Sequence, residues 1–178
     1  EISCSLVGSE MCIRDSRISE AEKYSSNGKD EAEFYLSVNP GEPLKPLGSV
    51  ASGGEISRVM LAVKTVLADE EDTPTLIFDE IDTGISGITA GKVGDRLRLI
   101  GKSRQVICIT HLPQIAATAD HHFLIRKKAE GTSVRTDVEM LDEAASVEEL
   151  ARLLGGANVT ERVMESAKEL KELAKCER

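Results

Sequence analysis

The chain has 178 residues, which is enough for one domain with a hydrophobic core. Its composition, 40% hydrophobic and 30% charged, is ordinary for a globular protein, but only 3% of residues are aromatic and tryptophan is absent, which argues against stacking platforms for single-stranded nucleic acid. A formal net charge of -9 also argues against a broad DNA-binding face on this chain, although it leaves room for a local basic patch or for DNA contact by another part of a larger protein.

The cysteines and the apolar runs indicate in which cellular compartment the protein is expected. The four cysteines form no CxxC pair and are too sparse for a disulfide framework, so we expect a reducing, cytoplasmic setting. No apolar run approaches the length of a membrane span, and we expect no membrane partner.

The N-terminal stretch EISCSLVGSEMCIRDSR has neither a steady helical nor a steady strand period. It resembles translated adaptor or vector sequence, and we interpret residues 1–17 as a non-native or disordered leader, with Ser5 to Ser16 as the suspect part. The alternative is a genuine irregular N-terminus. The polar segment from Ile18 to Asp30 is predicted to be a frayed helix end or a loop.

The next segments predict a strand, a connector and a helix. Residues 31–39, EAEFYLSVN, alternate as a strand does, and PGEPLKPL then has three prolines in eight residues, which predicts a rigid, extended connector. The glycine pair that follows opens a predicted helix. Its apolar face, with the spacing of one helical side, consists of Ile56, Val59, Met60, Val63 and Leu67.

Two continuous apolar runs mark the middle of the chain. TLIFDE, residues 75–80, and QVICIT, residues 105–110, are typical of parallel strands buried on both faces. Pro113 suits the first turn of a short helix through Ala117. Between the two runs lies a predicted helix with inward residues Val93, Leu97 and Ile100.

The C-terminal part predicts two strands and two helices. HHFLIRK and SVRTDVEML indicate an antiparallel strand pair, and Ser146 with Glu149 predicts a capping box on a helix that the glycines after Leu154 end. Asn158 is expected to cap the last helix, whose apolar stripe is Val163, Ala167, Leu170 and Ala174. The element order predicts an α/β fold with a mostly parallel sheet flanked by helices and an antiparallel strand pair near the C-terminal end.

Polar residues follow both central strands. In the segment LIFDE, Asp79 and Glu80 follow an apolar strand and lie at its C-terminal end, where α/β sheets bind their ligands. One acid can hold Mg²⁺, usually through water, and the next can orient or deprotonate an attacking water. His111 follows the second strand and can hydrogen-bond a phosphate oxygen. Taken singly, the acid pair is equally a solvated strand cap, and a lone histidine is more often satisfied within a loop.

The segment SGGE precedes the first central helix. Gly53 and Gly54 let the backbone approach an anion closely, and a helix N-terminus offers unpaired N–H groups and the positive end of a dipole. Ser52 adds a hydroxyl. The plainer interpretation is a turn in which Ser52 caps the helix.

The three motifs together are more specific than any one of them. ASGGE, a helix, LIFDEID, a helix and an apolar strand ending in TH resemble the signature motif, Walker B strand, D-loop and switch histidine of the ATP-binding-cassette ATPases. Glu55 stands where the transporter branch has glutamine, and NPGEPLKPLGSVASGGEISRVMLAVK, FDEIDTGISG and THLPQIAA are similar to the SMC-like, chromosome-maintenance and repair branch. The resemblance covers about Asp30 to Leu173, so residues 18–178 are identified as the C-terminal half of an SMC-like ATPase head.

The resemblance implies a site shared by two heads, with ATP and Mg²⁺ as cofactors. Asp79 would hold the Mg²⁺ shell through water, while Glu80 and His111 would be the catalytic residues, one polarising the attacking water and the other touching the γ-phosphate. Asp82, in the D-loop, would sit at the dimer contact and couple the two sites. The residues that would reach the γ-phosphate of the ATP on the opposite head are Ser52, Gly53, Gly54 and Glu55.

One part of the family pattern is missing. The nearest match to the Walker A motif GxxxxGK[ST] is GITAGKV, residues 87–93, which is one residue short and has Val93 in place of the hydroxyl. The expected partners are therefore a second head in a homodimer, an N-terminal half that bears Walker A, and DNA through the complete protein, in the cytoplasm and at the nucleoid. We expect the complete protein to be an ATPase of DNA double-strand-break repair and recombination, and this chain alone to be inactive. The alternative is a non-catalytic dimerisation or scaffold module of an SMC-like protein.

Overall fold

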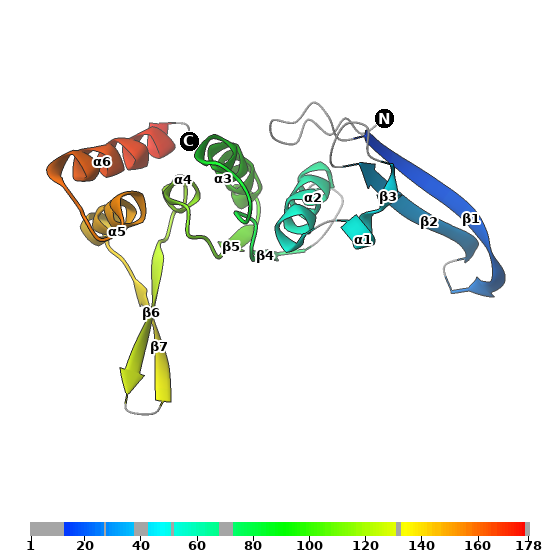
Figure 1. Cartoon of the computed structure of the whole chain (residues 1–178), viewed down its shortest axis with the longest axis horizontal. Helices are drawn as coiled ribbons and strands as arrows, with labels where there is room; N and C mark the ends of the chain where they lie inside the picture. The colour runs from blue at the N-terminus through cyan, green and yellow to red at the C-terminus, as the bar shows by residue number, and fades with distance from the viewer. Residues whose placement is uncertain are drawn as a thin grey trace.

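The computed structural model describes residues 13–26, 28–37, 43–50, 52–67, 73–130 and 133–176. Figure 1 shows an elongated molecule with a β-arm at one end, a central α/β unit, a protruding hairpin and a helix pair at the other end. The mixed α/β class is as predicted.

The N-terminal arm is a strand ribbon. β1 (Ile13–Ser25) and β2 (Gly28–Ser37) pair antiparallel, and β3 (Lys45–Pro46) joins the other edge of β2. The predicted helix end or loop at 18–30 is wrong, because pairing with β2 satisfies the backbone of these mostly exposed polar residues without a hydrophobic face. The predicted strand at 31–39 lies in β2, as far as the described residues reach.

The predicted leader lies largely outside the described residues. Residues 13–17 belong to β1, whereas 1–12 are not described, so the non-native origin of Ser5 to Ser16 stays a prediction. Most of the proline-rich connector is likewise undescribed, and its last residues form β3 and the start of α1 (Leu47–Val50).

The central unit is built on one parallel strand pair. β4 (Thr75–Phe78) and β5 (Gln105–Cys108) run parallel, with Thr75 opposite Gln105 and Phe78 opposite Cys108. α3 (Gly87–Gly101) is the crossover that parallel pairing requires. α2 (Gly53–Val66) precedes β4, and α4 (Pro113–Ala116) follows β5, beginning at Pro113 as predicted. Parallel pairing is confined to β4 and β5 among the described strands.

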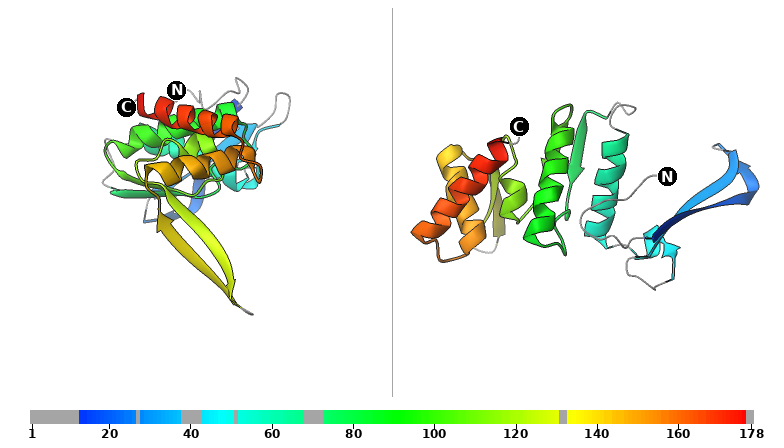
Figure 2. Two further views of the ribbon diagram at one scale, coloured as in Figure 1. Left: turned by 90° about the vertical axis from the view of Figure 1, so that its left-hand side faces the viewer. Right: turned by 90° about the horizontal axis from the view of Figure 1, so that it is seen from above.

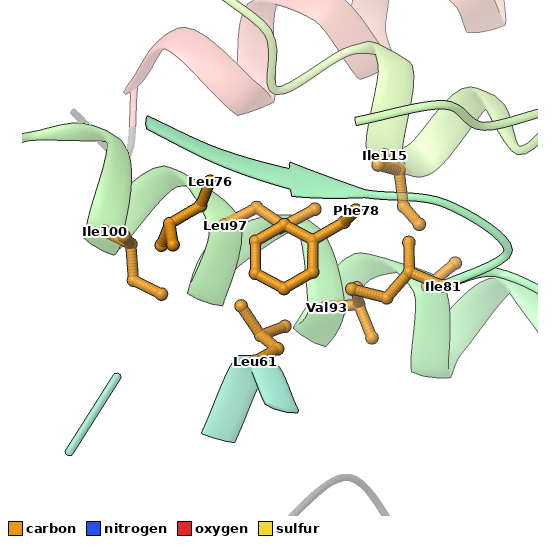
Figure 3. Packing of buried hydrophobic residues seen from close by; sticks show 9 residues of the cluster. Leu61, Leu76, Phe78, Ile81, Val93, Leu97, Ile100 and Ile115 are labelled. Atoms are coloured by element: carbon orange, nitrogen blue, oxygen red, sulfur yellow. The ribbon is translucent and has the colours of Figure 1, made fainter. Parts of the chain in front are cut away.

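A hydrophobic core fills the space between the strand pair and its helices (Figure 3). Its buried members are Leu61, Leu76, Phe78, Ile81, Ala90, Val93, Leu97, Ile100 and Ile115, which confirms the predicted inward residues of α3. The prediction that both faces of these strands are buried is wrong. Ile77 and Ile107 lie on the face of the strand pair that points away from the core, and they are 67% and 45% exposed.

The helix predicted after the glycine pair is confirmed as α2, but its apolar face is not packed on the core of this chain. Ile56, Met60 and Val63 are exposed, whereas Leu61 is buried in the core with 1% exposure. Figure 2 shows α2 beside α3 at the edge of the central unit, so only a narrow side of α2 meets the core. Periodicity identifies residues that share a helix face but not what packs against it.

The C-terminal part contains the predicted antiparallel hairpin and two helices. β6 (Phe123–Glu130) and β7 (Ser133–Met140) pair from Phe123 opposite Met140, and the hairpin projects from the body in Figure 1. α5 (Glu143–Gly155) and α6 (Glu161–Cys176) pack on a second core. That core and its packed neighbours include the whole predicted stripe of α6: Val163, Ala167, Leu170 and Ala174.

Both predicted helix caps in this part are wrong by a few residues. Asp142 caps α5, its carboxylate accepting the Ala145 N–H, while Ser146 lies inside the helix and bonds the His122 ring. The Thr160 hydroxyl accepts the Val163 N–H at the start of α6, in place of Asn158. Within the described residues, no helix is long and apolar enough to cross a membrane.

Candidate active site

The first turn of α2 holds the SGGE motif in a reciprocal cap. Ser52 is the N-cap, its hydroxyl accepting the Glu55 N–H at 3.3 Å, and the Glu55 carboxylate accepts the Ser52 N–H at 2.8 Å. The first N–H groups of a helix have no partner within the helix, which allows a helix N-terminus to bind an anion. At this terminus Gly53 is exposed and Gly54 is buried. The capping role is therefore compatible with an anion-binding role.

The start of α2 lies against the turn that follows β4. The Ser57 hydroxyl donates to the Asp79 carbonyl at 2.9 Å, and the Arg58 guanidinium donates to the carbonyls of Ile81 and Thr83 at 3.1 and 2.9 Å. Ser57 and Arg58 were not among the predicted site residues. Because they follow Gly54 by three and four residues, they lie on the same side of the helix as Gly54. This spacing could have identified them as neighbours of the site from the sequence alone.

The glycines permit this close approach. A Cβ atom at Gly54 would lie 2.8 Å from the Glu80 carbonyl oxygen and 2.9 Å from that of Thr83. A Cβ atom at Gly53 would overlap the Glu80 carboxylate. The structure therefore brings SGGE and the acid pair together within one chain.

The acid pair sits in a strained turn. Glu80 has φ 57, the only positive φ at a non-glycine residue in the described part of the chain, and such a backbone costs about 1–2 kcal/mol. The Asp79 carboxylate accepts the Glu80 N–H at 2.8 Å, and the Glu80 carbonyl accepts the Thr83 N–H at 3.0 Å. Both acidic side chains are exposed, so they remain accessible to a ligand and to water.

Asp82 and His111 form a pair across the two strand ends. One Asp82 carboxylate oxygen accepts the Thr110 hydroxyl at 2.6 Å and the His111 backbone N–H at 2.7 Å, and lies 3.0 Å from His111 Nδ1. Burial opposes the charge on Asp82, but the bonds from Thr110 and His111 outweigh it and hold the pKa of this carboxyl below its usual value.

The structure shows where Asp82 lies within its own chain. The expected place was a contact between two heads, whereas the Asp82 side chain is 3% exposed and is enclosed by its own chain. His111, in contrast, is 71% exposed. The structure thus joins His111 to the end of β4 through Asp82, and the role of Asp82 at a dimer contact stays a prediction.

The acids alone do not make a metal site. No group of three or more histidine, cysteine or acidic residues in the described part of the chain is placed to hold a metal ion. Asp79 fits a Mg²⁺ site of the kind that takes most of its ligands from waters and substrate phosphates, since it offers one exposed carboxylate.

The rejected Walker A candidate is helical. Gly87 is the first residue of α3, so GITAGK forms the first turns of a helix and not a loop that could wrap a phosphate. The helical conformation therefore agrees with the spacing of the segment, which is one residue too short for a Walker A motif.

The sequence is similar to that of known DNA repair proteins. It is 52% identical over 151 residues to "DNA repair protein RecN" of Halalkalibacterium halodurans, a match of 85% of this chain and 27% of that protein. RecN of Vibrio cholerae is 49% identical over 143 residues, with 80% and 26% covered. The chain is a homologue of the RecN proteins. It spans about a quarter of the length of these relatives.

The fold agrees with the RecN homology. The Smc head domain of Pyrococcus yayanosii, solved with a coiled coil and joint, matches 77% of this chain and 25% of its own with a TM-score of 0.52 at 23% identity. The chain therefore has the fold of part of an Smc head domain. No protein-family model matches the chain.

Proposed function

We propose that this chain is part of the ATP-hydrolysing head of a RecN-type DNA repair protein. The observation that carries the proposal is the exposed acid pair on the turn after β4, with the loop of His111 joined to the same turn through Asp82. The SGGE segment lies against the other side of this turn. Ligands of α/β folds bind at this edge, beyond the carboxyl ends of the strands.

The residues have distinct roles in this proposal. Asp79 holds a water of the Mg²⁺ shell, Glu80 orients and polarises the attacking water, and His111 contacts the γ-phosphate. Bound Mg²⁺ and the triphosphate supply the electrophile and its charge neutralisation. The signature residues Ser52, Gly53, Gly54 and Glu55 present the N-terminus of α2 to a nucleotide held by a second head in a homodimer.

A further polypeptide segment completes the head in this proposal. The relatives are about four times as long as the matched region. On the face of β4 and β5 that points away from the core, Ile77 and Ile107 are exposed beside the hydrogen-bonded pair of Thr75 and Gln105. An N-terminal segment that bears Walker A would cover this face and bind the nucleotide on the same head. The names of the RecN relatives support a role of the complete protein in DNA repair. A role of the complete protein in recombination is part of the same proposal.

The decisive experiment is ATP hydrolysis by this chain alone and mixed with a Walker A-bearing N-terminal segment of a RecN relative. We expect no turnover by the chain alone and turnover by the mixture. Glu80→Gln should lower kcat of the mixture on the order of 10²-fold or more, since it removes the base but keeps the shape. Glu148→Gln, an exposed position on α5, is the matched control and should leave kcat unchanged.

A non-catalytic dimerisation or scaffold module is the second candidate. The helical state of GITAGK favours it for this chain taken alone, because this segment was the nearest match to a phosphate loop. A mixture that assembles into a folded head and yet fails to hydrolyse ATP would support the module and contradict the ATPase proposal.

A further inference from the structure

The strained turn after β4 is bonded to α2 through one arginine. Nη1 of Arg58 donates to the carbonyl of Ile81 at 3.1 Å and to that of Thr83 at 2.9 Å. These carbonyls follow Glu80, whose φ is 57. Because Nη1 carries two hydrogens and a guanidinium keeps its charge at every ordinary pH, Arg58 can serve both acceptors at once as a permanently charged donor.

The peptide before Glu80 is tied to the same helix. The Ser57 hydroxyl donates to the Asp79 carbonyl at 2.9 Å, so α2 is bonded to the turn on both sides of Glu80. Gly54, one turn earlier on α2, leaves room for these contacts, since a Cβ atom there would lie 3.0 Å from Arg58 Nη1. The glycine therefore admits the arginine as well as the carbonyls of the turn.

A positive φ at a residue with a side chain needs support from its surroundings. The Cβ atom is then crowded by the following carbonyl oxygen, and the conformation persists only where neighbouring groups over-determine it. Two bonds lie within the turn: the Glu80 N–H donates to the Asp79 carboxylate, and the Thr83 N–H donates to the Glu80 carbonyl. Those bonds would move with the turn, whereas the bonds from Arg58 join it to a helix.

The backbone of Glu80 sets where its side chain points, because the backbone conformation fixes the direction of the Cα–Cβ bond. The Glu80 carboxylate is exposed and lies against Gly53 at the start of α2. We propose that Arg58 is the positioning residue of Glu80: its bonds to the turn keep the Glu80 backbone at positive φ and so direct the carboxylate to the attacking water. The catalytic part of this inference rests on the proposed function, whereas the conformation of the turn is a property of this chain alone.

The first test is NMR of the full chain, which needs no nucleotide. At positive φ the amide proton and the α proton of one residue lie close together, so the NOE between them reports the backbone of Glu80. We expect a strong NOE in the wild-type chain. We expect its loss in Arg58→Met, which keeps an apolar stem and removes the donors of both bonds. A weak NOE in the wild-type chain, or a full one in Arg58→Met, overturns the proposal.

Arg98→Met is the matched control for a general loss of stability. Arg98 lies in the last turn of α3 and also donates to a backbone carbonyl, that of Ala174 at 2.9 Å. This variant should keep the Glu80 NOE, and an equal loss in both variants contradicts the proposal. If Arg58→Met fails to fold, Arg58→Gln takes its place, because glutamine is polar but two bonds shorter than arginine.

The second test is ATP hydrolysis by the mixture with the N-terminal segment. Arg58→Met should lower kcat on the order of 10-fold to 100-fold, with a smaller effect on KM, because a displaced catalytic group loses its alignment with the reacting atoms. In the Glu80→Gln background the same change should lower kcat further by only about 3-fold or less, since residues that act through one group are not additive. A further loss as large as in the wild type would show that Arg58 acts by another route, and would overturn the positioning role.

The two tests separate this inference from the proposed function. A wild-type mixture without ATPase activity would overturn the proposed function and the catalytic part of the inference, while the NOE still decides whether Arg58 holds the turn. An active mixture in which Arg58→Met keeps the wild-type kcat would overturn the positioning role alone.

Discussion

The backbone of Glu80 shows how a functional residue can carry strain. Its φ of 57 suits glycine, and replacement by glycine should relieve about 1–2 kcal/mol. We predict that Glu80→Gly is more stable than Glu80→Ala by about 1 kcal/mol, the reverse of the usual order, because both lose the carboxylate and only alanine keeps a Cβ. Urea unfolding of the two variants measures the difference. Equal stability, or a more stable alanine variant, would show that the turn is relaxed.

The two glycines of the signature motif differ in what a side chain would meet. At Gly54 a methyl group would press on two backbone carbonyls, which cannot move cheaply, whereas at Gly53 it would meet only the end of the Glu80 side chain. We predict that Gly54→Ala costs about 1–3 kcal/mol of unfolding free energy and Gly53→Ala about 0.5 kcal/mol or less. Chemical denaturation checks the order, and equal costs would contradict the close packing at Gly54.

Cys108 should be an unreactive thiol. Burial, followed by the nearby charges of Asp82 and Asp79, raises its pKa to about 12. Because only the thiolate is nucleophilic, a raised pKa suppresses reaction at every pH below it, and at pH 8 we predict alkylation at least about 100-fold slower than at exposed Cys176. Peptide mapping by mass spectrometry after timed iodoacetamide treatment measures both rates. Unfolding in urea should abolish the difference, and similar rates in the folded chain would contradict it.

At the scale of elements, α2 shows that the helical spacing of apolar residues does not determine which of them pack into the core. Leu61 is buried in the core while its neighbour Met60, on the face that periodicity favoured, is 47% exposed. We predict that Leu61→Ala lowers the unfolding free energy of this chain by about 2–5 kcal/mol and that Met60→Ala changes it by about 0.5 kcal/mol or less. Thermal and urea unfolding test both. A larger cost at Met60 would restore the face expected from sequence.

The elements that sequence predicted well are those whose signals are local. Continuous apolar runs located β4 and β5, and the spacing of Val93, Leu97 and Ile100 gave the buried face of α3. The strand β1 was missed because its stability comes from pairing with β2 and not from an apolar face. For the site, motif order grouped SGGE, the acid pair and His111, but the enclosure of Asp82 depends on where two strand ends meet, which no spacing within one segment encodes.

At the scale of the whole molecule, large apolar side chains lie together on three of the exposed surfaces in the part of the chain that the structure describes. They are the bare face of the central strand pair, the exposed stripe of α2 and one face of the β6–β7 hairpin; the exposed residues are Ile77, Ile107, Ile109, Ile56, Met60, Val63, Phe123, Ile125, Val138 and Met140. Scattered apolar residues on a surface need no explanation, but contiguous ones on a strand face mark an interaction site. The RecN homologues are long enough to supply a segment that covers them.

The face of the central strand pair gives this idea its sharpest test. Ile77 is 67% exposed, so Ile77→Lys should change the stability of the isolated chain by about 0.5 kcal/mol or less. The same change should prevent assembly with the N-terminal segment, because a lysine would be buried without a partner. Ile88→Lys is the matched control, since Ile88 is 82% exposed on α3 and away from the strand face. Co-elution in size-exclusion chromatography measures assembly. If Ile77→Lys co-elutes with the N-terminal segment as fully as Ile88→Lys does, the strand face is not the surface that the rest of the head covers.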